Sequence, residues 1–523
     1  MSGQAMWVKG TLLLSIAGLL SKVLGMVYRI PLQNLAGDEG LYIYQQIYPI
    51  LSLAIILSLY SIPSAISQVI ADNKRPNASI RIKDVLVVFY LLFAGGAAVF
   101  ILLYALAPWL AGLMGDPQLT QPIRVSSAIF LVIPFTAFLR GYFQIEDQYS
   151  VMASSQVVEQ LFRVAGIIIF TVIITGAGLS LYQVGTLAAW STIGGTVVGA
   201  SFLFIAYRFY IKSQSSRSEK VSISPSNLTR GLLVGLSIYS LTYVLHLLVQ
   251  VIDVFTMIDL LKDWGASTQA SKVWKGVYDR GNPLIQLGLV FGSSIALSLI
   301  PSLRKSDADI SSGSTDDEKF ALKFTFLFST AATAGLIAIM PMVNPLFYKS
   351  SDGTFAIQLM MPAVFLLSLV ITFSVILQRY GVKLQQLIWV VVMLVIKGIG
   401  NTLLIPLYGI TGASIATLIA LAFLTLVMYY HYQRLTKSLV KYTFLVNTLL
   451  VTAFMGLLIS LITHWVLDLI DIQNRLIYIP VVALTCTIGA AIFIYSTYKF
   501  KLLSNKELQL ITTYLKAKKG TDD

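Results

Sequence analysis

Long apolar segments separated by short polar ones recur along the whole chain. About 14 of them reach the length that a helix needs to cross the hydrocarbon core of a bilayer. The segments are expected near residues 8–30, 45–70, 85–110, 124–144, 157–176, 182–208, 230–257, 283–303, 322–347, 355–378, 384–405, 410–432, 442–467 and 475–498. The pattern predicts an all-α integral membrane protein.

Composition supports this prediction and determines how the positive net charge of the chain is interpreted. The 523 residues are 56% hydrophobic and 12% charged, whereas soluble domains carry about 25% charged residues. A net charge of +13 would indicate nucleic acid as the partner of a soluble protein. In a membrane protein it indicates cytoplasmic loops that face anionic lipid, so membrane lipids are expected as partners and nucleic acid is not.

The basic residues also predict an orientation. An even number of spans places both termini on one side of the membrane. Most of the 37 Lys and Arg residues lie in segments that are cytoplasmic if the N-terminus is cytoplasmic, as the positive-inside rule requires. Both termini are therefore predicted to be cytoplasmic.

The two halves of the chain resemble each other. "GLYIYQQIYP" followed by "IPSAI" recurs as "GVYDRGNP" followed by "IPSL", and "LYQVGTLAAWST" recurs as "LYGITGASIAT". Six spans per half is an even number, so the repeats are expected to be parallel, related by an axis along the membrane normal. The predicted domains are a six-helix bundle at 1–211, a serine-rich cytoplasmic linker at 212–228, a second six-helix bundle at 229–436, two accessory helices within 437–500 and an amphipathic cytoplasmic tail at 501–523.

The first span carries two basic residues, Lys22 and Arg29. A cation near the middle of such a helix costs about 2.5–3.5 kcal/mol on insertion scales. Gly18 and Gly25 fall on the same helical face as these cations. We expect the stripe to line a water-filled cavity; the alternative for Lys22 is that its side chain reaches an interface.

Other polar residues are predicted inside the membrane. Glu159 and Arg163 are one helical turn apart and can pair, either to hold helices together or as part of a site. Arg140 and Lys397 are further intramembrane cations. The seventh span has a polar face, interpreted as a cavity wall or a hydrogen-bonded core, formed by Tyr239, Tyr243, His246, Gln250 and Asp253.

Two of these features suggest more specific roles. Asp253 and His246 are the acid–imidazole combination on this face, and they are candidates for binding a coupling proton or cation. Arg280 precedes the eighth span and is interpreted as a second cation near the cavity mouth. The alternative is an ordinary loop residue paired with Asp279.

Motifs of soluble and membrane enzymes are missing from the sequence. There is no HExxH, no P-loop GK[ST] and no pair of inward acidic residues at metal-ligand spacing. We therefore expect no enzymatic activity, no metal and no cofactor. Because the P-loop that binds ATP is missing, the membrane potential or a Na⁺ or H⁺ gradient remains as the possible energy source for a transport process.

The motifs resemble those of the multidrug/oligosaccharidyl-lipid/polysaccharide flippase superfamily. "SKVLGMVYR" resembles the first-helix signature of MurJ-type lipid II flippases, with Lys22 at an arginine position. "GLYIYQQIYP", "IPSAISQVIA", "FLRGYFQ", "SSQVVEQLFRVAG" and "YDRGNPLIQLG" are more similar to the stage V sporulation protein B/YtgP branch. The resemblance implies a V-shaped fold of two six-helix bundles plus two helices in a bacterial plasma membrane.

The resemblance also implies export of an undecaprenyl-pyrophosphate-linked saccharide by alternating access. Lys22, Arg29 and Arg280 would meet the pyrophosphate, and the two extra helices would form a groove for the lipid tail. The sequence departs from the lipid II flippases in two places: Ile47–Ile70 contains no arginine, and their second first-helix arginine falls at Tyr28. The identity of the saccharide therefore stays open.

Two alternatives remain beside a lipid-linked saccharide flippase. One is a cation-coupled multidrug exporter of the same superfamily, and a dye-efflux assay separates the two. The other is a non-transporting scaffold for cell-wall synthesis. Cell-wall synthesis enzymes are possible partners in either a flippase or a scaffold role.

Overall fold

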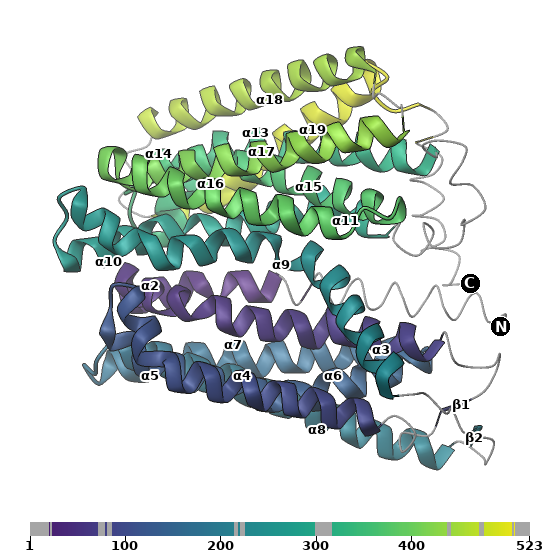
Figure 1. The fold of residues 1–523 in the computed structure, drawn as a ribbon. Helices are drawn as coiled ribbons and strands as arrows, with labels where there is room; N and C mark the ends of the chain where they lie inside the picture. Colours follow the sequence, from purple (N-terminus) through teal and green to yellow (C-terminus); the bar gives the residue numbers. More distant parts are fainter. Residues whose placement is uncertain are drawn as a thin grey trace. The chain divides into compact units, whose positions relative to one another are not determined.

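The computed structural model describes residue 20 and residues 23–71, 79–80, 86–213, 218–219, 225–298, 316–436, 441–469, 475–504 and 507. Nearly all of these residues are helical (Figure 1). The elements are α2 (Arg29–Ile56), η1 (Leu57–Ser61), α3 (Ile62–Ala71), β1 (Ser79–Ile80), α4 (Leu86–Leu113), η3 (Pro117–Leu119), α5 (Thr120–Ser127), α6 (Ile129–Ile145), α7 (Tyr149–Gly176), α8 (Tyr182–Ser213), β2 (Ser218–Glu219), α9 (Pro225–Asp263), α10 (Thr268–Asp279), α11 (Gly281–Ser298), α13 (Asp316–Tyr348), α14 (Thr354–Met360), α15 (Pro362–Arg379), α16 (Leu384–Tyr408), α17 (Ile410–Thr436), α18 (Tyr442–Leu469), η5 (Arg475–Ile477) and α19 (Tyr478–Lys499).

The predicted all-α membrane fold is confirmed. Within the described residues, 12 helical segments are long and apolar enough to cross a membrane. They coincide with the predicted segments, and α11 coincides with the described part of the eighth one. Most of the first predicted span lies outside the described residues, so the count of 14 is not confirmed. The two-residue strands β1 and β2 pair in parallel and are the exception to the helical pattern in this part of the chain.

The segment between the first two expected spans is helical. Helix runs through residues 31–44, and the only interruption that its backbone angles show is Gly37, with φ 69° and ψ −174°. That conformation is essentially restricted to glycine because a Cβ would clash there. One residue therefore ends the helix that carries Arg29 and begins the next, and no longer loop is needed.

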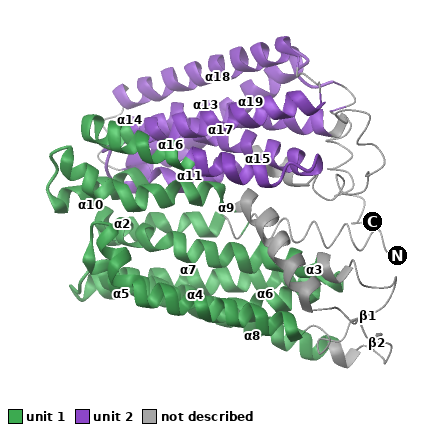
Figure 2. Ribbon diagram, viewed as in Figure 1, with its two compact units in different colours: residues 1–279, 394–413 green, residues 280–393, 414–523 purple. Residues whose placement is uncertain are grey.

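The chain packs as two compact units, coloured separately in Figure 2. The first unit contains residues 1–279 and 394–413, and the second contains residues 280–393 and 414–523. These units differ from the predicted domains, because α9, α10 and the C-terminal part of α16 pack with the first half of the chain. The predicted bundles on either side of the linker at 212–228 were derived from the internal sequence repeat and not from packing. They stay a prediction.

Reciprocal hydrogen bonds between Ser504 and Glu507 form a capping box at the start of the tail. Ser504 Oγ accepts a hydrogen bond from the main-chain N–H of Glu507 (3.3 Å), and Glu507 Oε2 accepts one from Ser504 (2.7 Å). Glu507 also pairs with Lys323 on α13 at 2.8 Å. Burial raises the pKa of the Glu507 carboxyl, but the hydrogen bonds from Lys323 and Ser504 outweigh burial and lower this pKa. The rest of the predicted amphipathic tail lies outside the described residues.

Helices α7 and α8 approach each other closely at glycines. A Cβ on Gly195 of α8 would lie 2.7 Å from the main-chain oxygen of Glu159 and 3.1 Å from the main-chain nitrogen of Arg163. A Cβ on the neighbouring Gly194 would meet nothing within 4 Å. Small residues that let backbones meet are a recurrent way to pack membrane helices. This contact fixes the part of α7 that carries Glu159 and Arg163.

These two glycines provide a matched pair of substitutions. Gly195→Ala should destabilise the protein by about 1–3 kcal/mol because the methyl group forces α7 and α8 apart. Gly194→Ala should be neutral or stabilising, since alanine has the higher helix propensity by about 1 kcal/mol. Thermal unfolding of both variants in the same detergent measures the difference. Equal unfolding temperatures would contradict the close contact.

Candidate functional site

Arg29 is the first predicted site residue that the structure places. It lies near the start of α2 with its side chain fully buried. None of its three guanidinium nitrogens has a hydrogen-bond partner among the described residues. Its guanidinium carbon lies 4.3 Å from the centroid of the Tyr48 ring. Lys22, the other predicted cation of this face, lies outside the described residues.

Glu159 does not form the predicted pair with Arg163. Its Oε2 atom pairs with Arg140 Nη2 at 2.6 Å, and its Oε1 atom accepts a hydrogen bond from Thr196 Oγ1 at 3.1 Å. Arg140 also donates to Ser58 (2.8 Å), which lies in the π-helical turn η1. The prediction considered only residues one turn apart on one helix, whereas the partner comes from α6.

Arg163 is instead directed toward the first helix. Its guanidinium carbon lies 5.8 Å from the Tyr28 ring, and a Cβ on Gly25 would lie 3.3 Å from its Nη2 atom. Arg163 is 6% exposed, and its Nε atom has no hydrogen-bond partner in the described part of the chain. Gly25, one of the two glycines of the predicted stripe, thus faces Arg163.

The polar face of the seventh span is part of α9. Gln250 and His246 are hydrogen-bonded at 2.6 Å. The side chains of Tyr239 and Tyr243 lie outside the described residues. This face therefore contributes a described polar pair and the carboxylate of Asp253.

Asp253 has a basic partner that the sequence analysis did not foresee. Its Oδ1 atom lies 2.8 Å from Lys397 Nζ and accepts a hydrogen bond from Asn401 at 2.9 Å. Tyr278 donates to Oδ2 at 3.3 Å, and Lys397 also donates to the carbonyl of Ala413 at 3.0 Å. The charge of Asp253 is therefore already balanced by Lys397, and a coupling role for Asp253 with His246 stays a prediction.

Arg280 is held by polar groups of the second unit. It donates to Asn344 Oδ1 and to the carbonyl oxygen of Ser350, both at 3.3 Å, and lies 5.4 Å from the Tyr348 ring. Asp279, the alternative partner of Arg280, binds Lys275 at 2.6 Å. Burial raises the pKa of Asp279, and Lys275 opposes that shift. The role of Arg280 as a cavity cation stays a prediction.

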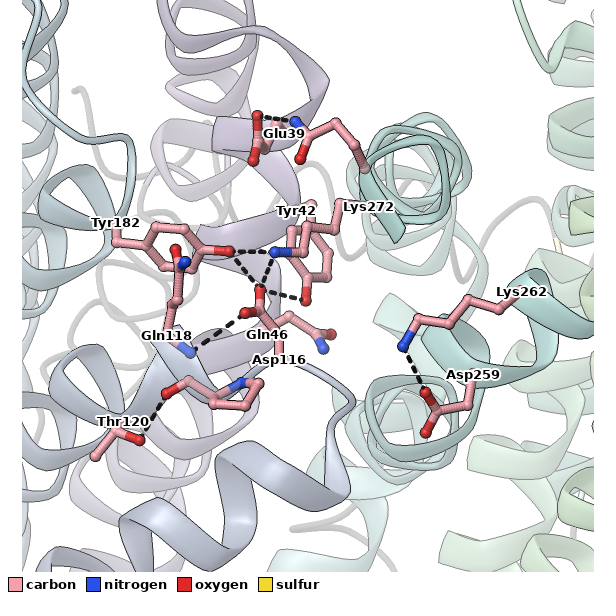
Figure 3. A network of polar contacts seen from close by, with 12 residues as sticks. Glu39, Tyr42, Gln46, Asp116, Gln118, Thr120, Tyr182, Asp259, Lys262 and Lys272 are labelled. Carbon is pink, nitrogen blue, oxygen red and sulfur yellow. Dashed lines mark hydrogen bonds and ion pairs between the residues drawn. The ribbon is translucent and has the colours of Figure 1, made fainter. Parts of the chain in front are cut away.

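A polar network that the sequence analysis missed joins four parts of the first unit (Figure 3). Asp116, in the turn after α4, accepts hydrogen bonds from Tyr42 (3.1 Å) and Tyr182 (2.5 Å). Lys272 of α10 lies 3.0 Å from the same carboxylate and donates to the Tyr182 hydroxyl at 2.6 Å. The sequence contains no local signal for this cluster, because its members lie far apart along the chain.

Charge balance distinguishes Arg29 and Arg163 from the basic residues that pair with buried carboxylates. Each buried carboxylate of the described residues has a basic partner, in the pairs Asp116–Lys272, Glu159–Arg140, Asp253–Lys397, Asp279–Lys275 and Glu318–Arg379. Arg29 and Arg163 have no carboxylate partner in this part of the chain. Both are buried and carry unpartnered guanidinium nitrogens in this part of the chain, so they are candidates for binding an anionic ligand. No group of three His, Cys, Asp or Glu residues in the described chain could hold a metal ion.

Comparison with known proteins relates this arrangement to a family. A family model described as polysaccharide biosynthesis protein matches residues 7–306. The uncharacterized membrane protein YabM of Bacillus subtilis is 36% identical over 79% of this chain and 77% of its own length. The lipid II flippase MurJ of Bacillus subtilis is 25% identical over 95% of this chain and 96% of its own.

Solved structures share the fold. A lipid II flippase MurJ in an inward closed conformation matches with a TM-score of 0.66 at 16% identity, covering 94% of this chain and 98% of that one. An inward-facing multidrug resistance MATE family transporter matches with a TM-score of 0.61 at 17% identity, covering 80% of this chain and 96% of that one.

Together these observations define a multi-pass membrane protein with the MurJ- and MATE-like fold of a flippase or transporter. The chain belongs to the polysaccharide biosynthesis protein family, within the multidrug/oligosaccharidyl-lipid/polysaccharide flippase superfamily.

The corrected ion pair can be tested by charge removal. Glu159→Gln should destabilise the protein by about 3–5 kcal/mol because it leaves Arg140 buried without a counter-ion. Adding Arg140→Gln should recover much of that loss, whereas adding Arg163→Gln should not. Thermal unfolding and protein abundance in membranes measure the recovery in a double-mutant cycle. A larger recovery with Arg163→Gln would restore the pair predicted from sequence.

Proposed function

We propose that the protein exports a polyprenyl-pyrophosphate-linked saccharide, such as lipid II or another surface-polysaccharide precursor, from the inner to the outer leaflet. The observation that carries the proposal is Arg29, fully buried with every guanidinium nitrogen unpartnered in the described chain. The 25% identity with the lipid II flippase MurJ of Bacillus subtilis over nearly the full length supports it.

Energetic magnitudes favour an anionic substrate at Arg29. Its contact with Tyr48 is a cation–π interaction, worth about 0.5–2 kcal/mol. Burying an ion without a counter-ion costs several kcal/mol even after the surroundings relax. The ring therefore offsets only part of the cost, and a phosphate would offset more because guanidinium binds phosphate in bidentate, charge-assisted hydrogen bonds.

The same argument disfavours the multidrug alternative. The MATE-like structures share the fold, and a fold does not determine a substrate. Arginines without acidic partners repel cationic drugs and attract phosphate. The site chemistry therefore favours the lipid-linked substrate over a cationic one.

The proposal includes the setting of transport. The protein would lie in a bacterial plasma membrane with both termini cytoplasmic and would work by alternating access without enzymatic chemistry. Cell-wall synthesis enzymes would consume the exported substrate. The membrane potential would supply the energy, because exporting a diphosphate moves negative charge outward and each charge gains about 2.3 kcal/mol per 100 mV.

Complementation tests the substrate class. In a strain depleted of its lipid II flippase, Arg29→Ala should fail to restore growth at normal protein levels because the phosphate loses its ligand. Arg29→Lys should restore part of the function, since the charge remains. Lys22→Ala should fail in the same way if the first-helix stripe acts as a unit.

The matched control is Lys262→Ala, which removes a partly exposed cation that pairs with Asp259 at 2.9 Å. That variant should complement fully. Normal growth with Arg29→Ala would overturn the proposed function.

The energy source requires a separate measurement. In proteoliposomes, an inside-negative potential should increase export of the fluorescently labelled lipid, and collapsing it with valinomycin and potassium should remove the increase. A sodium or proton gradient imposed without a potential should have little effect. Export that follows an ion gradient and ignores the potential would contradict this assignment.

A further inference from the structure

A row of aromatic side chains connects two buried guanidinium groups inside the first unit. Arg29 lies 4.3 Å from the Tyr48 ring centroid, and the Tyr48 and Tyr44 centroids are 6.0 Å apart. Tyr44 and Tyr28 are hydrogen-bonded through their hydroxyl groups, with centroids 5.7 Å apart. Arg163 ends the row, 5.8 Å from the Tyr28 ring. The two basic groups thus contact opposite ends of one row of tyrosines, Arg29 from α2 and Arg163 from α7.

Both guanidinium groups act on the same region. Arg29 contacts Tyr48 and Arg163 contacts Tyr28, and both of these rings pack against Tyr44. The contacts that the structure describes for this row include no carboxylate, and Glu159, one helical turn before Arg163, is bound to Arg140 at 2.6 Å. Two positive charges therefore flank one row of tyrosines.

The residues around Arg163 leave buried polar atoms without hydrogen-bond partners beside it. Arg163 Nε and Gln160 Oε1 are both buried and have no hydrogen-bond partner among the described residues. A Cβ on Gly25 would lie 3.3 Å from Arg163 Nη2 and 3.9 Å from Gln160 Oε1. A larger residue at position 25 would therefore crowd the guanidinium group. Gly25 is one helical turn before Arg29, so both lie on one face of the first helix.

We propose that Arg163 is a second phosphate ligand, and that Arg163 and Arg29 together bind a diphosphate with the Tyr28 and Tyr44 hydroxyls between them. This inference rests on the proposed function and deepens it, because it names the two residues that would select a diphosphate over a monophosphate. One guanidinium group suffices for a single phosphate, whereas two groups on separate helices provide one ligand for each phosphate of a diphosphate.

A purely structural role explains the arrangement less well. A buried arginine that holds helices together needs a carboxylate or carbonyl partner. The described contact between α7 and α8 at this level is made by Gly195 against the α7 backbone, and it does not use the guanidinium group. The Arg163 side chain is therefore available for a ligand.

Binding to the purified full-length protein in nanodiscs tests the inference with three probes: undecaprenyl pyrophosphate, undecaprenyl monophosphate and inorganic pyrophosphate. The wild type should bind the lipid diphosphate more tightly than the monophosphate. Arg163→Gln should weaken diphosphate binding by about 10- to 100-fold, the usual value of a charge-assisted hydrogen bond. Its affinity for the monophosphate should stay close to that of the wild type.

Two further variants keep the test decisive. Arg163→Lys retains the charge without the bidentate geometry, so it should lose part of the preference for the diphosphate; it also decides the question if Arg163→Gln does not fold. Gly194→Ala is the matched control elsewhere in the first unit and should bind as the wild type does. Thermal unfolding of each variant verifies that the compared proteins are folded.

The outcomes separate this inference from the proposed function. If Arg29→Gln abolishes lipid binding while both Arg163 variants keep the wild-type preference, the inference is overturned and the proposed function stands. If the wild type binds neither lipid, or binds inorganic pyrophosphate as tightly as the lipid, the proposed function itself is overturned. Inorganic pyrophosphate should compete weakly with the lipid diphosphate, and no competition at saturation would overturn recognition through the diphosphate.

Discussion

The neutralisation of buried charge is the constraint on which the described structure depends. Outside water, an ion is tolerated only with a counter-ion and well-placed hydrogen bonds, and each buried carboxylate of the described chain meets this condition. Glu159 with Arg140 links α7 to α6, and Asp253 with Lys397 links α9 to α16. The ion pairs therefore also determine which helices pack together.

Close helix packing makes these pairs possible. Gly195 lets the α8 backbone reach that of α7 next to Glu159, and Thr196, the next residue, donates to the Glu159 carboxylate at 3.1 Å. A larger residue at position 195 would move the hydroxyl away together with the helix. The small residues and the polar residues of this interface thus depend on each other.

The sequence predicted what depends on composition and on local spacing. Apolar length alone located the membrane helices, and helical spacing alone placed Gly25 and Arg29 on one face of the first helix. The sequence did not predict contacts between helices. Arg140 and Glu159 come from different helices, as do Lys397 and Asp253, so no spacing rule relates them. The one-residue turn at Gly37 was missed because the surrounding residues are equally compatible with a loop.

The same charge balance determines where the membrane potential acts in the proposed cycle. In that cycle, two arginines without acidic partners would give the empty site a positive charge, and a bound diphosphate would cancel most of it. The loaded site would then carry little net charge, so the field would do little work while the substrate crosses. After release, the positive site would return from the outward-accessible to the inward-accessible state, and an inside-negative potential would favour that movement by about 2.3 kcal/mol per charge per 100 mV. The potential would therefore drive export chiefly by resetting the empty carrier. This follows because the buried carboxylates of the described chain are paired with other basic residues, so that the charges of Arg29 and Arg163 would be left to the substrate.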